Sequence, residues 1–443
     1  MIIDGIKRGG RTIRPYNSVI ENGYHRGLAA TLRPIPKLEV SVFLSRVKRD
    51  GNIIVDSLDV DTPDQFVSSL QNNGSHRTIG EKLDKGAVGL STVGGIVKLR
   101  RKNLDVAINH LTYLLDQPLA RQDTPANLFR FGGDQLSLTS VDYSWRIRNL
   151  HLYGESAFSG SGGSGHIIGG LLGLDPSASL VINYRNYSRD YDALLSNAIG
   201  ESSLANNEEG LYIGTHLRFS RRFRLLGYVD LWRHDWIRSQ IGNPSSGREY
   251  SMRLEYSVRR KHSVYVQYFF EEKADNVRPE EGSVFFTDVS SLTTGFVRQR
   301  QRGRIHFAHK VSKSIELRSR VEFSHFKDIN GSSKGVMLFQ DLLYRPFGSS
   351  FSVTARYALF NTDGSDTQIY AYENDLLYEF SIPSFSGRGS RAYINLRFDP
   401  IKRLTTEFRI ARTFKDRGTH GSGNEFIEGK FRTELKAQLR YSF

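Results

Sequence analysis

Three carboxylates recur on one side of a short alternating segment, at Glu373, Asp375 and Glu379. Side chains two positions apart on a β-strand point to the same face, so all three would gather in one place. Carboxylates buried together require cationic partners. We expect inward-facing Arg409 and Arg432 to supply them. The predicted charge cluster in the lumen would then be structural ion pairing, with a substrate or gating role as the alternative.

Other catalytic patterns are weak. The sequence has no Cys, which excludes thiolate ligands and a Cys nucleophile, and its His residues lack metal-site spacing. The run Gly160–Gly165 fits G-x-G-x-x-G, but an apolar β-like run, Ile167–Leu174, follows it where a dinucleotide site needs a helix. A flexible loop is therefore predicted there.

Acidic pairs provide the remaining candidates. Glu208-Glu209, Glu271-Glu272 and Glu280-Glu281 lie in or beside predicted loops. We interpret them as solvated loop charge, with cation binding as the alternative. No catalytic residue, metal site or cofactor is predicted from the sequence.

Alternation with a period of two dominates the chain and predicts β-strands. About 20 such segments of roughly 10–13 residues occur, near the ~9–11 residues that cross a bilayer as a tilted strand. No apolar run of about 18 residues exists, so a helical membrane span is excluded. The predicted fold class is all-β, a large antiparallel transmembrane β-barrel of roughly 18–20 strands.

The connections between these segments alternate in length, as in outer-membrane barrels with short periplasmic turns and long extracellular loops. Short turns are predicted near Pro34–Lys37, Arg101–Asn103, Asn149, Pro176, Arg221–Arg222, Arg260–Lys261, Lys310–Lys313, Pro346–Ser349 and Asp399–Arg403. Longer loops are predicted near 50–87, 115–134, 159–165, 189–208, 233–246, 273–295 and 327–333. Small helices are expected within loops at Ile79–Lys85 and Tyr191–Ala198.

The alternation of turns and loops fails between 361 and 398, where one span is extra or missing. Ile369–Phe380 is the suspect segment, either a spanning strand or a segment folded inward or into a loop. Residues 1–23 are expected to lead into a single barrel over 24–443.

Charge and hydropathy are compatible with this fold. The formal net charge is +14, with a pI of about 9.7 and a mean hydropathy of -0.42. Such a basic balance could attract nucleic acid or anionic lipid, although Lys and Arg lining a wet lumen and the rims is the interpretation that we favour. The start, Met1–Arg8, has no apolar h-region and does not resemble a secretory signal.

The last predicted strand resembles the C-terminal assembly signal of bacterial outer-membrane proteins. Its apolar face ends on an aromatic residue, and the opposite face is mostly charged. The signal residues are Phe431, Leu435, Leu439, Tyr441 and Phe443. This resemblance implies recognition by the barrel-assembly machinery and localisation in the bacterial outer membrane.

A second resemblance covers nearly the whole chain. The matching runs include Arg14–Ser18, His76–Thr78, Gly200–Ser203, Asn207–Tyr212, Ala358–Asp363, Ile369–Asp375 and Gly421–Gly423. They resemble the C-terminal β-barrel region of the helix-hairpin-helix domain-containing, ComEA-related outer-membrane proteins of Bacteroidota. The resemblance suggests that a signal peptide, a DNA-binding-type segment and one or more N-terminal strands are missing from this chain. DNA would then be a partner of the full-length protein, and no residue here is expected to bind it.

Together these features predict a non-enzymatic outer-membrane barrel that acts as a pore, a transporter or an envelope-complex component. The expected partners are outer-membrane lipid and lipopolysaccharide, the barrel-assembly machinery and an envelope protein. One alternative is a surface protein for DNA handling or adhesion. Another is a barrel-embedded hydrolase, which would need Ser, His and a carboxylate converging at the wall.

Overall fold

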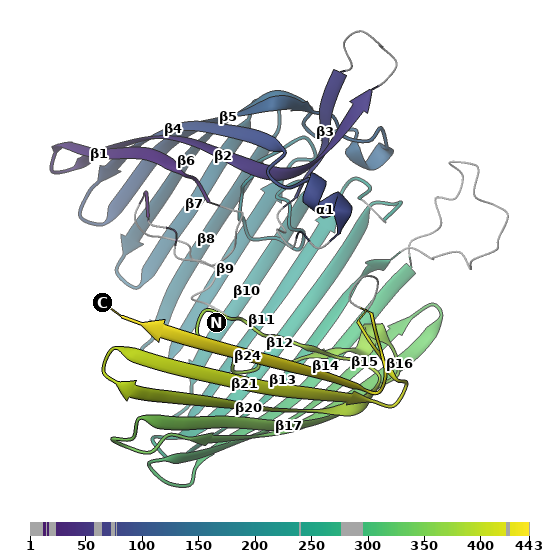
Figure 1. Ribbon diagram of the computed structural model, residues 1–443. Coiled ribbons are helices and arrows are strands. Elements are labelled where there is room, and N and C mark those ends of the chain that lie inside the picture. Colours follow the sequence, from purple (N-terminus) through teal and green to yellow (C-terminus); the bar gives the residue numbers. More distant parts are fainter. Residues whose placement is uncertain are drawn as a thin grey trace. The chain divides into compact units, whose positions relative to one another are not determined.

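The computed structural model is all-β, and its main sheet contains 20 strands (Figure 1). It describes residues 12–14, 16, 24–56, 64–71, 76, 78–238, 241–275, 296–421 and 426–442. The predicted fold class, a large antiparallel barrel-like sheet of about 20 strands, is confirmed.

The chain divides into two compact units. Unit 1 comprises Met1–Thr215, Tyr228–Arg248 and Ala274–Gly295, and unit 2 comprises His216–Gly227, Glu249–Lys273 and Phe296–Phe443. Four strands contribute residues to both units: β10 (Glu208–Arg218), β11 (Phe223–His234), β12 (Ser245–Val258) and β13 (His262–Asp275).

Unit 1 contains nine further strands, which pair mainly as antiparallel neighbours along the chain. They are β1 (Gly27–Ile35), β2 (Leu38–Asp56), β3 (Asp64–Gln71), β4 (Val88–Arg100), β5 (Leu104–Leu119), β6 (Gly133–Ile147), β7 (Leu150–Ser159), β8 (Ser164–Asp175) and β9 (Ala178–Tyr187). The long β2 pairs with β1, β3 and β4. A helix, α1 (Ile79–Leu83), and a 3-10 turn, η1 (Pro125–Asn127), lie in its connections.

Unit 2 is built on seven strands that lie side by side in chain order (Figure 1). They are β14 (Phe296–Lys310), β15 (Ile315–Asp328), β16 (Gly331–Tyr344), β17 (Phe351–Thr362), β20 (Arg388–Ile401), β21 (Leu404–Lys415) and β24 (Phe431–Tyr441). Two-residue strands form small pairs in the loops: β18 (Ile369–Tyr370) with β19 (Ser384–Phe385), and β22 (Thr419–His420) with β23 (Ile427–Glu428). The 3-10 turn η2 spans Ser365–Thr367.

In these strands the charged side chains are buried and the apolar side chains are exposed, the reverse of a soluble protein. On β15 the charged side chain of Glu322 is 2% exposed, whereas the neighbouring Phe323 is 53% exposed. On β24 Leu435 and Leu439 are 66% and 71% exposed. We call the two sides the polar face and the apolar face. Strands of this length, apolar outside and charged inside, are those of an outer-membrane barrel, and the outer-membrane localisation predicted from the sequence agrees with them.

Turn positions follow the predictions closely. The strand pairs β1–β2, β4–β5, β16–β17 and β20–β21 are each joined by a short turn at the predicted place. The predicted long loop at 327–333 is wrong, because only Ile329 and Asn330 separate β15 from β16. Gly331, with a φ of 132°, provides the left-handed backbone conformation that this tight turn requires.

One of the two predicted loop helices forms. Thr78 and Glu81 make a capping box at the start of α1, so the expected helix is present there. Tyr191–Ala198 is not helical, and that prediction is wrong. Tyr191 is buried among Ala157, Tyr187 and Ala205, and burial raises its pKa to about 12. These tertiary contacts override the local helical preference.

Among the described residues no helix is both long and apolar enough to cross a membrane. Most of the segment 1–23, together with Glu280-Glu281 and Phe443, lies outside the described residues. The acidic pair at 208–209 does not behave as predicted, since Glu208 is fully buried and bonded to Arg185 in unit 1. Glu271 is likewise buried on β13, where it pairs with Lys273.

Candidate functional site

The segment between β17 and β20 accounts for the failed alternation of turns and loops. Ile369–Phe380 does not span as a strand; only Ile369 and Tyr370 pair, with Phe385 and Ser384, and Glu373 forms an isolated bridge with Ser381. Residues 363–387 therefore fold back on themselves. We call them the polar-face hairpin, because their contacts are with the polar face of unit 2. One span in the sequence-based count was extra.

The hairpin is seated by a small apolar core. Ile369, Ala371 and Phe385 pack against buried side chains of β16 and β17. The sheet residues of this core are Met337, Phe339, Ala358 and Phe360. Each apolar group that these contacts remove from water stabilises the hairpin in its position on the sheet. Apolar residues therefore occupy both faces of β16 here, one for the hairpin and one exposed.

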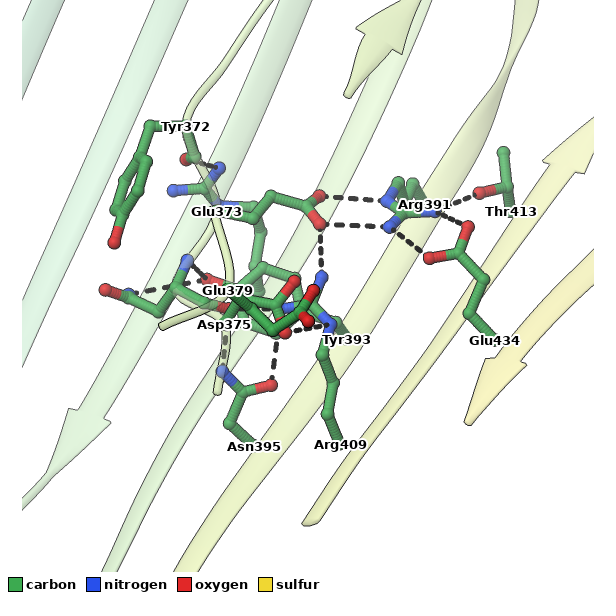
Figure 2. A network of polar contacts seen from close by, with 12 residues as sticks. Tyr372, Glu373, Asp375, Glu379, Arg391, Tyr393, Asn395, Arg409, Thr413 and Glu434 are labelled. Carbon is green, nitrogen blue, oxygen red and sulfur yellow. Dashed lines mark hydrogen bonds and ion pairs between the residues drawn. The ribbon is translucent and has the colours of Figure 1, made fainter. Parts of the chain in front are cut away.

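Glu373 is the centre of the polar contacts (Figure 2). Its carboxylate accepts two hydrogen bonds from Arg391, at 2.9 and 3.0 Å, and a third from Arg409 at 2.5 Å. The carboxylate and both guanidinium groups are almost completely buried. Fork-shaped donors on an ionised acceptor are the strongest hydrogen bonds available to a protein. The hairpin is thereby joined to both β20 and β21.

Arg391 extends the network to the last strand. It donates to Thr413 Oγ1 at 2.7 Å and to Glu434 on β24 at 3.1 Å. A second branch runs through Lys436, whose ammonium lies 3.1 Å from Asp375 and 2.8 Å from Glu379. Four consecutive elements of unit 2, the hairpin, β20, β21 and β24, are connected in this way.

Backbone carbonyls at the hairpin tip are also bound. Arg409 donates to the Asn374 carbonyl, which also accepts from Asn395 Nδ2 at 2.7 Å. Arg356 on β17 donates to the Tyr372 carbonyl at 2.7 Å, while its other nitrogens bind Asp341. Because the tip carbonyls have partners on the sheet, the hairpin needs no water to satisfy them.

The structure brings together four of the five residues predicted for the charge cluster: Glu373, Asp375, Glu379 and Arg409. Arg432 is not a partner of these carboxylates, and its guanidinium lies 3.3 Å from Glu434 instead. Sequence reasoning missed Arg391 and Lys436. The strand register that could have found them places Lys436 directly opposite Arg409, but register is not visible in the sequence.

A polar cavity of about 390 Å³ opens beside the hairpin tip, toward the short turns of unit 2. Asn374 and Asp375 line it from the hairpin, and Asn395, Arg397 and Glu407 line it from β20 and β21. Charges of both signs meet there. The arrangement can hold water and small polar solutes, and it offers no paired nucleophile and base.

The predicted assembly-signal residues lie on one face of β24. Phe431, Leu435, Leu439 and Tyr441 are all on the exposed apolar face, and Phe443 lies outside the described residues. Their partners remain a prediction.

A separate Ser–His contact occurs in unit 1. Ser144 Oγ lies 2.8 Å from His151 Nε2, and Asp105 is the residue opposite Ser144 in the sheet register. A nucleophile bonded to a base is two thirds of a hydrolytic triad. A similar contact joins His166 and Ser156 at 3.1 Å, so such pairs also arise simply on a polar strand face.

Comparison with known proteins gives only structural similarity. No protein-family model and no curated protein matches the chain, so the resemblance to helix-hairpin-helix proteins stays a prediction. The ferripyoverdine receptor of the Pseudomonas aeruginosa outer membrane is 9% identical over 94% of this chain and 64% of that chain, with a TM-score of 0.48.

Two further structures extend the comparison. An FpvAI–pyocin S2 complex is 9% identical over 94% of this chain and 62% of that chain, with a TM-score of 0.47. The anion-selective porin from Comamonas acidovorans is 12% identical over 92% of this chain and 100% of that chain, with a TM-score of 0.34. This chain thus spans less than two thirds of the length of the matched chains in the FpvAI–pyocin S2 complex and the ferripyoverdine receptor. At such TM-scores the similarities carry no argument about function.

Proposed function

We propose that this protein is a non-enzymatic outer-membrane barrel whose polar face lines a passage for polar solutes, and that the polar-face hairpin narrows that passage. The observation that carries the proposal is the hairpin itself, which is held on the polar face by Glu373, Arg391 and Arg409. A segment of 25 residues (363–387) folded onto that face must reduce the space available to solutes. Of the three predicted roles, pore, transporter and envelope-complex component, we therefore favour the first two.

The chemistry of the hairpin favours a fixed constriction. Its charged groups are paired and its apolar side chains are packed, and burial of paired charges makes release of one partner costly. The nearby cavity, with Asn395, Arg397 and Glu407, supplies hydrogen-bonding groups for water and small solutes of either charge. A weakly selective passage is the expected behaviour.

The test is conductance of the purified full chain in planar lipid bilayers. We expect single-channel steps from the unaltered protein and larger steps when 369–385 is replaced by a Gly-Ser linker of equal length. Glu379→Gln is the matched control, because the exposed carboxylate of Glu379 pairs with Lys436 at the hairpin edge, and its step size should stay close to the unaltered value. Absence of any conductance, or equal steps with and without the hairpin, would overturn the proposal.

A hydrolase is the second candidate, favoured by the contact between Ser144 and His151. It predicts turnover of esters or lipids that Ser144→Ala abolishes while Ser156→Ala does not. If the unaltered chain shows no ester or lipid turnover in detergent or vesicles, the hydrolase is excluded. DNA handling at the surface, the third candidate, predicts DNA binding that weakens steeply as salt rises.

A further inference from the structure

The apolar face of unit 2 contains a groove. A cavity of about 410 Å³ opens over β16, β17, β20 and β21 at the end where these strands meet the longer connections. Its walls include Leu338, Tyr357, Leu359 and Phe414, and its floor includes Ser390. The side chain at the floor of this hollow, Ser390, is small, and so is the next one along the same face of β20, Ala392.

Strand register explains the hollow. Ser390 lies directly between Leu359 on β17 and Phe414 on β21. A small side chain between two large ones leaves a trough that runs along the strand. Leu359 is exposed on one wall and Phe414 is half-buried on the other. The lining of the trough is mainly apolar, and its polar members besides Ser390 are Asn361, Arg388 and Asp416.

One arginine, Arg388, lines the groove, and a second, Arg412, lies on the neighbouring β21. Arg388 is highly exposed, with Asp416 3.3 Å away. Arg412 projects from the apolar face, and its guanidinium lies 4.2 Å from the centre of the Phe431 ring. Phe431 is paired with Phe414 in the sheet, one row nearer the longer connections than Arg412. The Arg412 side chain therefore extends toward the same end of the strands as Arg388, over β24 and on the far side of Phe414 from Ser390.

The positions of Arg388 and Arg412 indicate the depth in the membrane at which this end of the groove lies. A guanidinium facing lipid is tolerated near the interface and disfavoured at the bilayer midplane. The connections at this end, 363–387 and 416–430, are long, whereas the opposite end carries the turns at 345–350 and 402–403. In outer-membrane barrels the long connections face outward. Arg388 and Arg412 thus lie at the headgroup level of the outer leaflet.

We propose that the groove binds one acyl chain of a phosphorylated glycolipid of the outer leaflet, of the lipid A type, with its phosphate between Arg388 and Arg412. The acyl chain would lie along Ser390, between Leu359 and Phe414. Guanidinium groups are well suited to phosphate because their donors match its oxygens. The inference takes from the proposed function only the outer-membrane location.

The experiment is native mass spectrometry of the full chain in detergent, with bis-phosphorylated lipid A, its dephosphorylated form and phosphatidylglycerol as separate probes. We expect the unaltered protein to retain lipid A, and the double variant Arg388→Gln/Arg412→Gln to bind it about tenfold more weakly, as the loss of charge-assisted bonds predicts. Ser390→Phe, which fills the groove, should weaken binding of both lipid A forms. Arg403→Gln, at the opposite end of the β20–β21 pair, is the matched control and should bind like the unaltered protein.

Three outcomes would overturn the inference: no retained lipid A, retention by the double variant or by the Ser390→Phe variant equal to that of the unaltered protein, or retention of phosphatidylglycerol equal to that of lipid A. Heat-modifiable gel migration of every variant shows whether it is folded, and a folded variant is required for each comparison. Conductance measured on the same preparations separates the two proposals. Intact conductance without lipid binding would overturn only the proposal of a lipid-binding groove. Lipid binding without conductance would overturn only the proposal of a passage for solutes.

Discussion

Glu373 is a buried carboxylate held by two guanidinium groups, and its energetics are asymmetric. Replacing a whole buried ion pair by apolar groups can be neutral, but removing one partner leaves the others charged without compensation. Here the loss would leave Arg391 and Arg409 facing each other across a neutral side chain. Both arginines keep other acceptors, Glu434 and Asp375, which limits the cost.

We predict that Glu373→Gln lowers the free energy of unfolding by about 3 kcal/mol, the lower end for a broken buried pair. Glu379→Gln should cost less than about 1 kcal/mol, because its side chain is 53% exposed and its pair with Lys436 is open to water. Urea unfolding of the barrel in lipid vesicles measures both. Equal costs for the two variants would contradict the central role of Glu373.

A second carboxylate, Glu208, anchors a connection in unit 1. It is buried against Arg185 at 2.6 Å and accepts the backbone N–H groups of Glu201 and Ser202. Glu208 thus helps to hold the far end of the connection 188–207, together with the contacts that Asn207 makes with His234 and Trp236.

We expect Glu208→Gln to make 188–207 about tenfold more sensitive to protease, since weakening a charge-assisted contact by roughly 1.4 kcal/mol raises the open population tenfold. The neighbouring Glu209→Gln is the control, because Glu209 pairs with half-exposed Tyr184 and exposed Arg233. Limited proteolysis of the folded protein measures the cleavage rate within 188–207 for each variant. Identical cleavage of both variants would show that Glu208 does not anchor the connection.

At the residue scale the sequence predicts part of the charge cluster. Parity along a strand predicts that Glu373, Asp375 and Glu379 gather, and they do. It cannot choose among basic residues on neighbouring strands, because every second position of β24 is inward. Arg432 lies opposite Thr413, whereas Lys436 lies opposite Arg409, two rows away. Without the register, the sequence predicted Arg432 as the partner of the carboxylates in place of Lys436.

At the scale of elements, the polar-face hairpin explains an ambiguity in β16. Its residues 336–344 are apolar or aromatic on both faces apart from Gln340 and Asp341. A strand between lipid and water should alternate strictly. The second apolar face is explained by Ile369 and Phe385, which cover Met337 and Phe339.

Phe385 should therefore hold the hairpin in place. Phe385→Ala removes a buried ring that packs edge-to-face on Phe360, with ring centres 5.3 Å apart, and we expect a loss of about 3 kcal/mol. Hydrogen exchange of the backbone over 369–385 should become faster. Phe380→Ala, at a ring that is 73% exposed, should leave the exchange unchanged, and equal effects of the two changes would argue against the packing described.

For the whole molecule, the sequence predicted the fold class correctly and counted one spanning strand too many. Strand length and alternation are local properties, and they predicted the all-β sheet and most turn positions. Whether an alternating segment crosses the membrane depends on contacts with residues distant in the sequence. Ile369–Phe380 alternates like a strand, yet Glu373 finds its partners only by folding onto β20 and β21. Tertiary ion pairs therefore decided the topology where periodicity could not.

Orientation is the property of the whole molecule that both proposals share. The longer connections of unit 2, 363–387 and 416–430, lie at one end of its strands together with the two-residue turn between β15 and β16. The turns at 311–314, 345–350 and 402–403 lie at the other end, and in outer-membrane barrels the long connections face outward. The chain has no Cys, so single cysteines can report on each end without background. Arg417 lies in an exposed turn after β21, and Lys402 in the exposed turn between β20 and β21.

We predict that a membrane-impermeant maleimide applied to intact cells labels the Arg417→Cys variant and spares the Lys402→Cys variant. After the cells are broken, both should label equally, which controls for reactivity and expression. The opposite pattern would place Arg388 and Arg412 at the periplasmic rim. A lipid A site is then impossible, because that glycolipid belongs to the outer leaflet, whereas a passage through the polar face would still work in either direction.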